Sequence, residues 1–178
     1  MSTPAIDTLF TEADRIQTRL AALNDCAPET ACLQFMRCCG SSNWSARMAK
    51  RRPFSSLEEL QEIADREWRA CSREDCLEAF AAHPRIGERL GSRWSEQEQS
   101  GVISSVSSQA QTELAKVNAA YEARFGYIFI VCATGKSARE ILGLLKARLA
   151  NDAAVELQNA AEEQRRITRM RLRKLLGE

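Results

Sequence analysis

Histidine is almost absent from this sequence, which has one histidine among 178 residues. The chain has seven cysteines, an odd number, and no two of them are spaced as a CxxC pair. A metal site with two histidines is therefore impossible, and neither a zinc ribbon nor a disulfide framework is indicated. We expect no bound metal.

Long apolar runs and an excess of one charge are also missing. No stretch approaches the roughly 20 apolar residues that span a bilayer, and no basic segment followed by an apolar run opens the chain. We therefore expect a soluble, cytoplasmic protein with no membrane partner. The 25 Lys and Arg residues balance 24 Asp and Glu residues, which argues against a general attraction to nucleic acid. A small molecule or another protein is the expected partner.

The patterning of the residues predicts helices. A chain of 178 residues, 44% of them hydrophobic, is long enough for one sizeable core and short for two, so we expect a single domain over residues 1–178. Apolar residues recur at helical spacing nearly everywhere, and Ser-x-x-Asp/Glu patterns mark helix starts. The expected fold is all-α, a multi-helix bundle with helices over about 6–23, 28–40, 44–50, 56–68, 72–83, 95–125, 137–151 and 152–176.

One segment breaks the helical pattern. Residues Tyr127 to Ala133, YIFIVCA, form the only β-like run, and a lone strand has nothing to pair with. We expect a buried extended connection there instead. Its backbone amides need hydrogen-bond partners, which a bound polar ligand could supply.

His83 is the candidate acid or base. Because the ring of Pro84 disfavours helical geometry in the residue before it, the helix that starts near Ser72 should end close to His83. The glycines at 87 and 91 then loosen the chain, and such junctions often display catalytic groups. The residues alone leave a second interpretation open, in which His83 is a helix cap whose charge complements the helix dipole. The pair Ser95 and Glu98 could likewise be only a capping box.

Arg171 stands out in the basic C-terminal helix. It lies four residues after Ile167 and four before Leu175, so helical spacing places its guanidinium on the apolar stripe. Such an inward cation needs an anionic partner, which could be a substrate or a buried glutamate. Arg169 and Arg173 are expected on the outward face of the same helix.

Five blocks of sequence carry a resemblance to a known family. In order they are CCGSSNWSARMAKRRPF, LEAFAAHPRIG, a Ser-x-x-Glu-Gln pattern, NAAYEARFGYIFIVCATGKSAREIL and EEQRRITRMRLRKLL. Together they resemble 2-oxo-4-hydroxy-4-carboxy-5-ureidoimidazoline (OHCU) decarboxylase. The likeness covers most of the chain from Phe35 onwards.

This resemblance implies an all-helical enzyme of urate breakdown. Members of the family are usually homodimers, need no cofactor, and convert the small molecule OHCU to (S)-allantoin and carbon dioxide. The competing hypothesis is a non-enzymatic helical interaction module, in which His83 is a cap and the basic C-terminal helix docks a partner.

The family pattern also implies the site residues. The catalytic histidine falls on His83, and the glutamate that assists it falls on Glu98. Because this chain repeats Glu-Gln at 96–97 and 98–99, either pair could fill the Ser-x-x-Glu-Gln pattern, and the second keeps the spacing from Ser95. The implied substrate contacts are Pro84, Ser95, Glu96, Gln97, Glu98, Gln99, Ile128, Phe129, Ile130, Val131, Cys132 and Arg171.

Overall fold

A computed structural model describes residues 11–86 and 108–178. Within these ranges the chain forms eight helices and no strand, which confirms the all-α prediction. The helices are α1 (Glu12–Asp25), α2 (Pro28–Cys39), α3 (Ser42–Lys50), α4 (Leu57–Arg69), α5 (Arg73–Ala81), α7 (Ser108–Phe125), α8 (Ala138–Arg148) and α9 (Ala153–Leu175). None of them is long and apolar enough to cross a membrane.

The helix starts follow from short local patterns. Ser72 and Ser137 each accept a hydrogen bond from a backbone amide of the first turn and complete a reciprocal capping box, as the sequence predicts. Ser56 caps α4 through the Glu59 amide, but the Glu59 carboxylate accepts from Ser55 instead of completing the box. Most elements thus begin where sequence patterns place them, within one or two residues.

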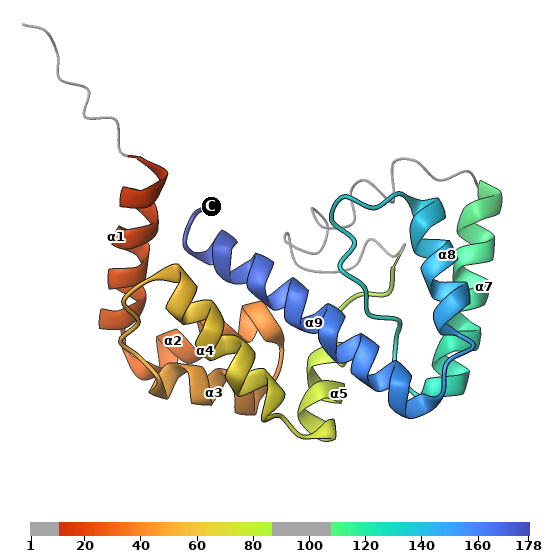
Figure 1. Cartoon of the computed structure of the whole chain (residues 1–178), viewed down its shortest axis with the longest axis horizontal. Helices are drawn as coiled ribbons and strands as arrows, with labels where there is room; N and C mark the ends of the chain where they lie inside the picture. Colours follow the sequence, from red (N-terminus) through yellow and green to blue (C-terminus); the bar gives the residue numbers. More distant parts are fainter. Residues whose placement is uncertain (1–10, 87–107) are drawn as a thin grey trace, which may run out of the picture.

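The helices form two groups that α9 joins. In Figure 1, α1 to α5 lie at one end, α7 and α8 lie at the other, and α9 runs along both. One apolar core fills the space between α1 to α5 and α9, with Phe35, Trp44 and Phe80 fully buried. A second core lies among α7, α8 and the segment before α8, around Tyr121 and Ile141.

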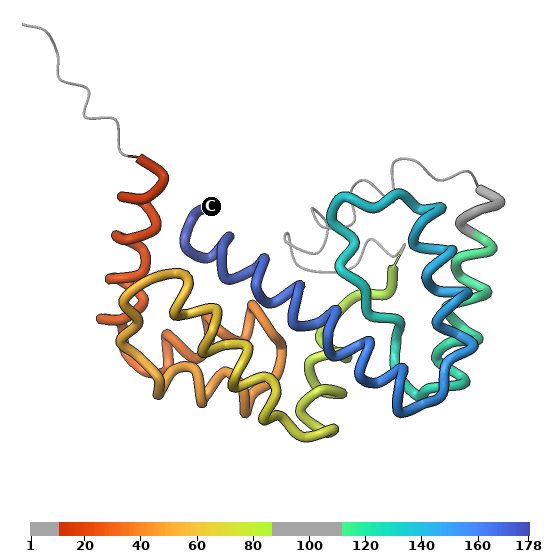
Figure 2. Tube along the Cα trace, in the orientation of Figure 1, coloured from red at the N-terminus to blue at the C-terminus, as the bar shows by residue number. Residues whose placement is uncertain are grey.

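The segment 127–133 is the predicted buried connection. It forms neither helix nor strand and passes from the end of α7 to the start of α8 (Figure 2). Ile130 belongs to the first core, whereas Phe129 and Val131 belong to the second. This alternation is typical of an extended chain, because successive side chains point to opposite sides. The segment therefore links the two cores.

A buried ion pair fixes this segment to the helices. Glu156 of α9 is completely buried and binds Arg148 of α8 at 2.6 Å, and it also accepts hydrogen bonds from Tyr121 and Asn151. Arg148 in turn donates to the carbonyl of Ile130 at 2.9 Å. Burial raises the pKa of Glu156, but the hydrogen bonds and the charge of Arg148 together outweigh it and hold the pKa below its usual range.

We expect Glu156→Gln to destabilise the protein. The amide keeps the shape of the carboxylate but loses the charge that Arg148 neutralises, which costs about 1.5–3 kcal/mol for a hydrogen bond to a charged group. A thermal melt should show a decrease of several degrees in Tm. The control is Glu113→Gln, because Glu113 pairs with Lys146 where both side chains are about half exposed, and its loss should be nearly neutral. Equal shifts in the two variants would contradict the structural role of the buried pair.

Candidate active site

His83 lies just beyond the end of α5. Its backbone amide donates to the carbonyl of Phe80 at 3.1 Å, so the residue closes the last turn before Pro84 leaves the helix. The end of α2 packs directly on this turn, because a Cβ atom added to Gly40 would come within 2.6 Å of the Ala82 Cβ. Gly40 also has a φ of 85°, which favours glycine. The junction is therefore held by a close helix-to-helix contact.

The imidazole of His83 reaches across to α9. Its Nε2 atom lies 2.8 Å from the Oε1 atom of Gln164, which is fully buried. His83 as a whole residue is partly buried. Sequence patterns singled out His83, but they gave Gln164 no role. Its position about two helical turns before Arg171 was the signal that could have placed both side chains on one face.

Burial lowers the pKa of His83 to about 4, and the Arg171 guanidinium adds to this effect by repelling a second positive charge. The hydrogen bond with Gln164 acts in the opposite direction but is weaker. The imidazole is therefore neutral near pH 7. This finding disfavours the helix-cap interpretation, which requires a positive charge at the end of α5.

We expect the single histidine to titrate near pH 4 in the folded protein, instead of near its ordinary value of 6.5. Between these values the unfolded chain binds more protons, so the contribution of His83 to stability is present above pH 6.5 and is lost as the pH falls towards 4. The imidazole can be followed by proton NMR, because no second histidine overlaps its signals. A midpoint near 6.5 in the folded protein would contradict this assignment.

Arg171 is placed as the apolar stripe predicts. Only 6% of the residue is exposed, and Ile167 and Leu172 beside it are buried. Its charge acts on His83, so the structure brings these two predicted site residues together.

The prediction for Arg169 is wrong, whereas Arg173 is exposed as predicted. Arg169 binds Asp65 of α4 at 2.8 Å and also donates to Gln61. The contact between α4 and α9 turns this side chain towards a buried acid, and helical spacing within α9 alone could not reveal that.

The segment 127–133 is anchored on both sides. The Cys132 amide donates to Glu163 of α9 at 2.8 Å, and the Cys132 carbonyl accepts from Lys136 at 2.7 Å. In contrast, no acceptor among residues 11–86 and 108–178 pairs with the amides of Ile130 and Val131, although both residues are buried. Buried backbone amides of this kind need a partner, and a polar ligand can supply one.

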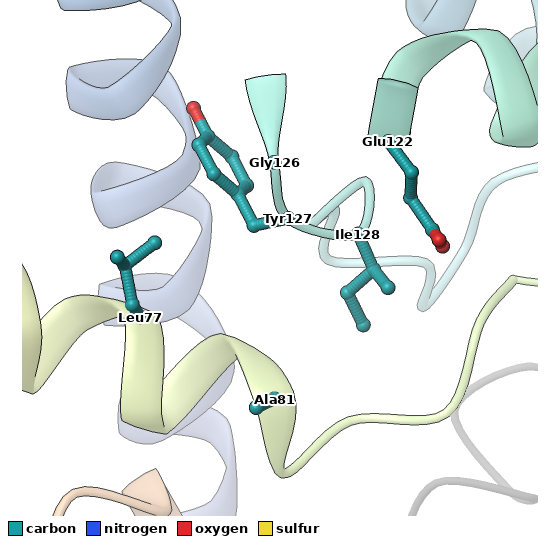
Figure 3. Close-up of a pocket in the computed structure, with 6 residues that line it drawn as sticks. All are labelled: Leu77, Ala81, Glu122, Gly126, Tyr127 and Ile128. Carbon is teal, nitrogen blue, oxygen red and sulfur yellow. The ribbon is translucent and has the colours of Figure 1, made fainter. Parts of the chain in front are cut away.

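A cavity of about 330 Å³ lies between α5 and this segment, and its lining consists of Leu77, Ala81, Glu122, Gly126, Tyr127 and Ile128 (Figure 3). In the figure the Ile128 side chain extends towards α5. Glu122 is paired with Arg85 at 2.5 Å. Among residues 11–86 and 108–178, Ile128 is the only predicted site residue in this lining, and neither His83 nor Arg171 contributes to it.

Comparison with known proteins decides the family. The family model described as OHCU decarboxylase matches residues 24–173. The chain belongs to the OHCU decarboxylase family. The resemblance stated from the sequence blocks is thereby confirmed.

Relatives of this decarboxylase family member differ in length. The chain is 39% identical over 148 residues to the uric acid degradation bifunctional protein TTL of Arabidopsis thaliana, covering 79% of this chain and 46% of that protein. It is 34% identical over 140 residues to the bifunctional protein PucL of Bacillus subtilis, covering 77% and 28%. It therefore spans less than half of these two bifunctional relatives. With the OHCU decarboxylase of Haloferax volcanii it shares 32% identity over 134 residues, covering 74% and 80%.

Solved structures agree with the family assignment. A crystal structure of an OHCU decarboxylase in the presence of (S)-allantoin has a TM-score of 0.75 and 39% identity, covering 81% of this chain and 97% of that one. A crystal structure of an (S)-allantoin synthase has a TM-score of 0.67 at 17% identity, covering 88% and 53%, and shows the fold alone.

Some of the site residues implied by the decarboxylase pattern lie outside the described residues: Ser95, Glu96, Gln97, Glu98 and Gln99. Their roles stay predictions. Within the described ranges, no group of three or more His, Cys, Asp or Glu side chains could hold a metal ion. Sequence reasoning missed three side chains that support the site: Gln164 on His83, and Arg148 and Glu163 on the segment 127–133.

Proposed function

We propose that this protein catalyses the decarboxylation of OHCU to (S)-allantoin and carbon dioxide. The observation that carries the proposal is the membership of the chain in the OHCU decarboxylase family, together with a His83 imidazole that burial and the charge of the buried Arg171 keep neutral. Family membership alone supports the reaction class, and the geometry supports which residues perform it.

The chemistry asks little of the protein beyond orientation and proton transfer. When the carboxylate leaves as carbon dioxide, its bonding electrons pass to the ring carbon that held it. The adjacent imine takes up these electrons, so the substrate is its own electron sink. The nitrogen of the former imine takes up a proton from the solvent. Loss of the hydroxyl proton and delivery of a proton to the neighbouring carbon then give the carbonyl and the new stereocentre of allantoin. We propose that no cofactor takes part.

His83 would exchange protons with the substrate in this scheme. A neutral imidazole can accept the hydroxyl proton near pH 7, and the same ring can return a proton to the neighbouring carbon. Proton delivery from one fixed face accounts for a single enantiomer. We propose that Glu98 orients the hydroxyl and His83, and that Pro84 contacts the ring of the substrate.

The remaining contacts would fix the substrate in place. Arg171 would bind a carbonyl or carboxylate through its planar fork. The amides of Ile130 and Val131 can donate to the ureido or ring carbonyl groups, together with Gln99. In this proposal the substrate site is also lined by the side chains and main chain of Ile128, Phe129 and Cys132.

The test is an ultraviolet assay with freshly generated OHCU. With the protein present, the OHCU signal should decay faster than its spontaneous rate, and the product should be optically active (S)-allantoin. Decay at the spontaneous rate with racemic product would overturn the proposed function. It would leave the interaction module as the better hypothesis, and that hypothesis requires no effect on OHCU at all.

We also propose that the chain forms a homodimer, as members of the family usually do. Sedimentation velocity over a range of concentrations should give a mass near twice the monomer mass of 19.9 kDa. A monomer at all concentrations that retains full activity would overturn this part of the proposal and leave the catalytic part standing.

A further inference from the structure

The side-chain amide of Gln164 is oriented by two neighbours. Its Nε2 atom lies 3.3 Å from the carbonyl oxygen of Cys39 and 3.2 Å from the hydroxyl oxygen of Thr168. A backbone carbonyl can only accept a hydrogen bond, so the NH₂ group of the amide must face Cys39. The opposite rotamer would place two acceptors against each other in a fully buried position. The oxygen Oε1 of Gln164 therefore points towards His83.

This orientation decides which nitrogen of His83 carries the proton. The Gln164 Oε1 atom is an acceptor only, and it lies 2.8 Å from His83 Nε2. The Nε2 atom must therefore be the donor. In a neutral imidazole the other nitrogen, Nδ1, then has the free lone pair and is the basic atom.

We propose that Gln164 is a positioning residue that holds His83 in its Nε2–H tautomer and presents Nδ1 to the substrate. The part of this inference that concerns the substrate rests on the proposed function. The part that concerns the tautomer rests on the contacts of Gln164 alone. Nδ1 is then the atom that accepts the hydroxyl proton and returns a proton to carbon.

The choice of an amide at this position has a physical consequence. A carboxylate in the place of Gln164 would stabilise the imidazolium and raise the pKa of His83. The amide oxygen fixes the ring in the same way without adding a negative charge. Among the residues that the structure describes, the charged side chain that affects the pKa of His83 is Arg171, which also lies on α9. From α2 the nearby ionisable group is Cys39, a thiol whose pKa is raised by burial, so it stays neutral.

Two other ion pairs near the junction are seen among residues 11–86 and 108–178. Arg85, two residues after His83, binds Glu122 of α7, and Glu163 on α9 binds Arg166. An amide at Gln164 thus orients the base, while burial and the neighbouring cation keep it unprotonated.

The tautomer can be read directly because the chain has one histidine. Long-range ¹H–¹⁵N correlation spectra of uniformly ¹⁵N-labelled protein near pH 7 distinguish a protonated ring nitrogen from one with a free lone pair. We expect the protonated type at Nε2 and the lone-pair type at Nδ1. A proton on Nδ1, or an averaged mixture of tautomers, would overturn the inference.

Two variants connect the tautomer to activity. Gln164→Glu should raise the pKa of His83 by about 1–3 units, because an opposite charge now faces the ring, and should move the acid limb of kcat/KM upwards by the same amount. Gln164→Met fills similar space without an acceptor, so the tautomer preference should disappear and kcat should fall while KM changes little. Unchanged pH profiles in Gln164→Glu would overturn the inference even if Gln164→Met unfolds.

Gln61→Met is the matched control. Gln61 is buried on α4 and exchanges hydrogen bonds with Arg169 of α9, but it does not contact His83. Its loss should lower Tm to a similar extent without altering the tautomer or the pH profile. The NMR measurements need no substrate. A wrong tautomer therefore overturns this inference even in an active enzyme, whereas absence of OHCU decarboxylation overturns the proposed function and leaves the tautomer result standing.

Discussion

His83→Ala and His83→Asn should reduce OHCU decarboxylation by about 10²–10⁴-fold, the usual worth of a positioned general acid or base. The fold should survive. His83 is partly buried and closes a junction at the end of α5, where it fills no part of either apolar core. The main structural cost is the lost partner of Gln164, about 1–3 kcal/mol at most for an unsatisfied buried acceptor. Circular dichroism should therefore show unchanged helix content and a Tm lower by only a few degrees.

Glu78→Gln provides the control for α5. Glu78 lies on the same helix and accepts hydrogen bonds from the amide and hydroxyl of Ser42, which tie α5 to α3. Its replacement should lower Tm slightly and leave turnover intact. If His83→Ala instead unfolds, or keeps turnover close to wild type, His83 is a structural residue and the proposed mechanism is wrong.

The parts of the fold that the sequence predicted are those set by neighbouring residues. The capping serines at 72 and 137 act within one helical turn. Gly40 ends α2 because it adopts the left-handed backbone conformation that favours glycine. The apolar stripe of α9 also follows from local spacing. It placed Arg171 correctly, because the burial of Ile167 and Leu172 carries the arginine inward with them.

The parts that could not be predicted depend on contacts between distant segments. Gln164 and His83 are 81 residues apart, and Arg169 and Asp65 are 104 residues apart. Nothing in either sequence neighbourhood indicates these partners, so Arg169 was expected on the surface. The candidate site was therefore predictable at His83 and Arg171. The helix end before Pro84 marks the first residue, and the apolar spacing of α9 marks the second, and both patterns involve only neighbouring residues. The supporting role of Gln164 required the packing of α9 against α5.

The Arg171 guanidinium gives the other large expected effect. Arg171→Lys keeps the positive charge but replaces a planar, bidentate fork with a point charge. If Arg171 binds a substrate carbonyl or carboxylate, losing one hydrogen bond to a charged group costs about 1.5–3 kcal/mol, roughly 10–100-fold in kcat/KM. The dissociation constant of (S)-allantoin should increase in parallel. The pKa of His83 should stay low in this variant, because the burial of the imidazole and the repelling charge are both retained.

Two arginines on the same helix separate binding from stability. Arg169→Lys should lower Tm without changing allantoin affinity, because Arg169 binds Asp65 and Gln61 and not the site. Arg173→Ala should stay within about 0.5 kcal/mol of wild type, since this side chain is half exposed.

Arg171→Gln adds a further measurement, because removing the cation should raise the pKa of His83. If Arg171→Lys melts much earlier but binds allantoin normally once folded, Arg171 is a structural partner and leaves the site.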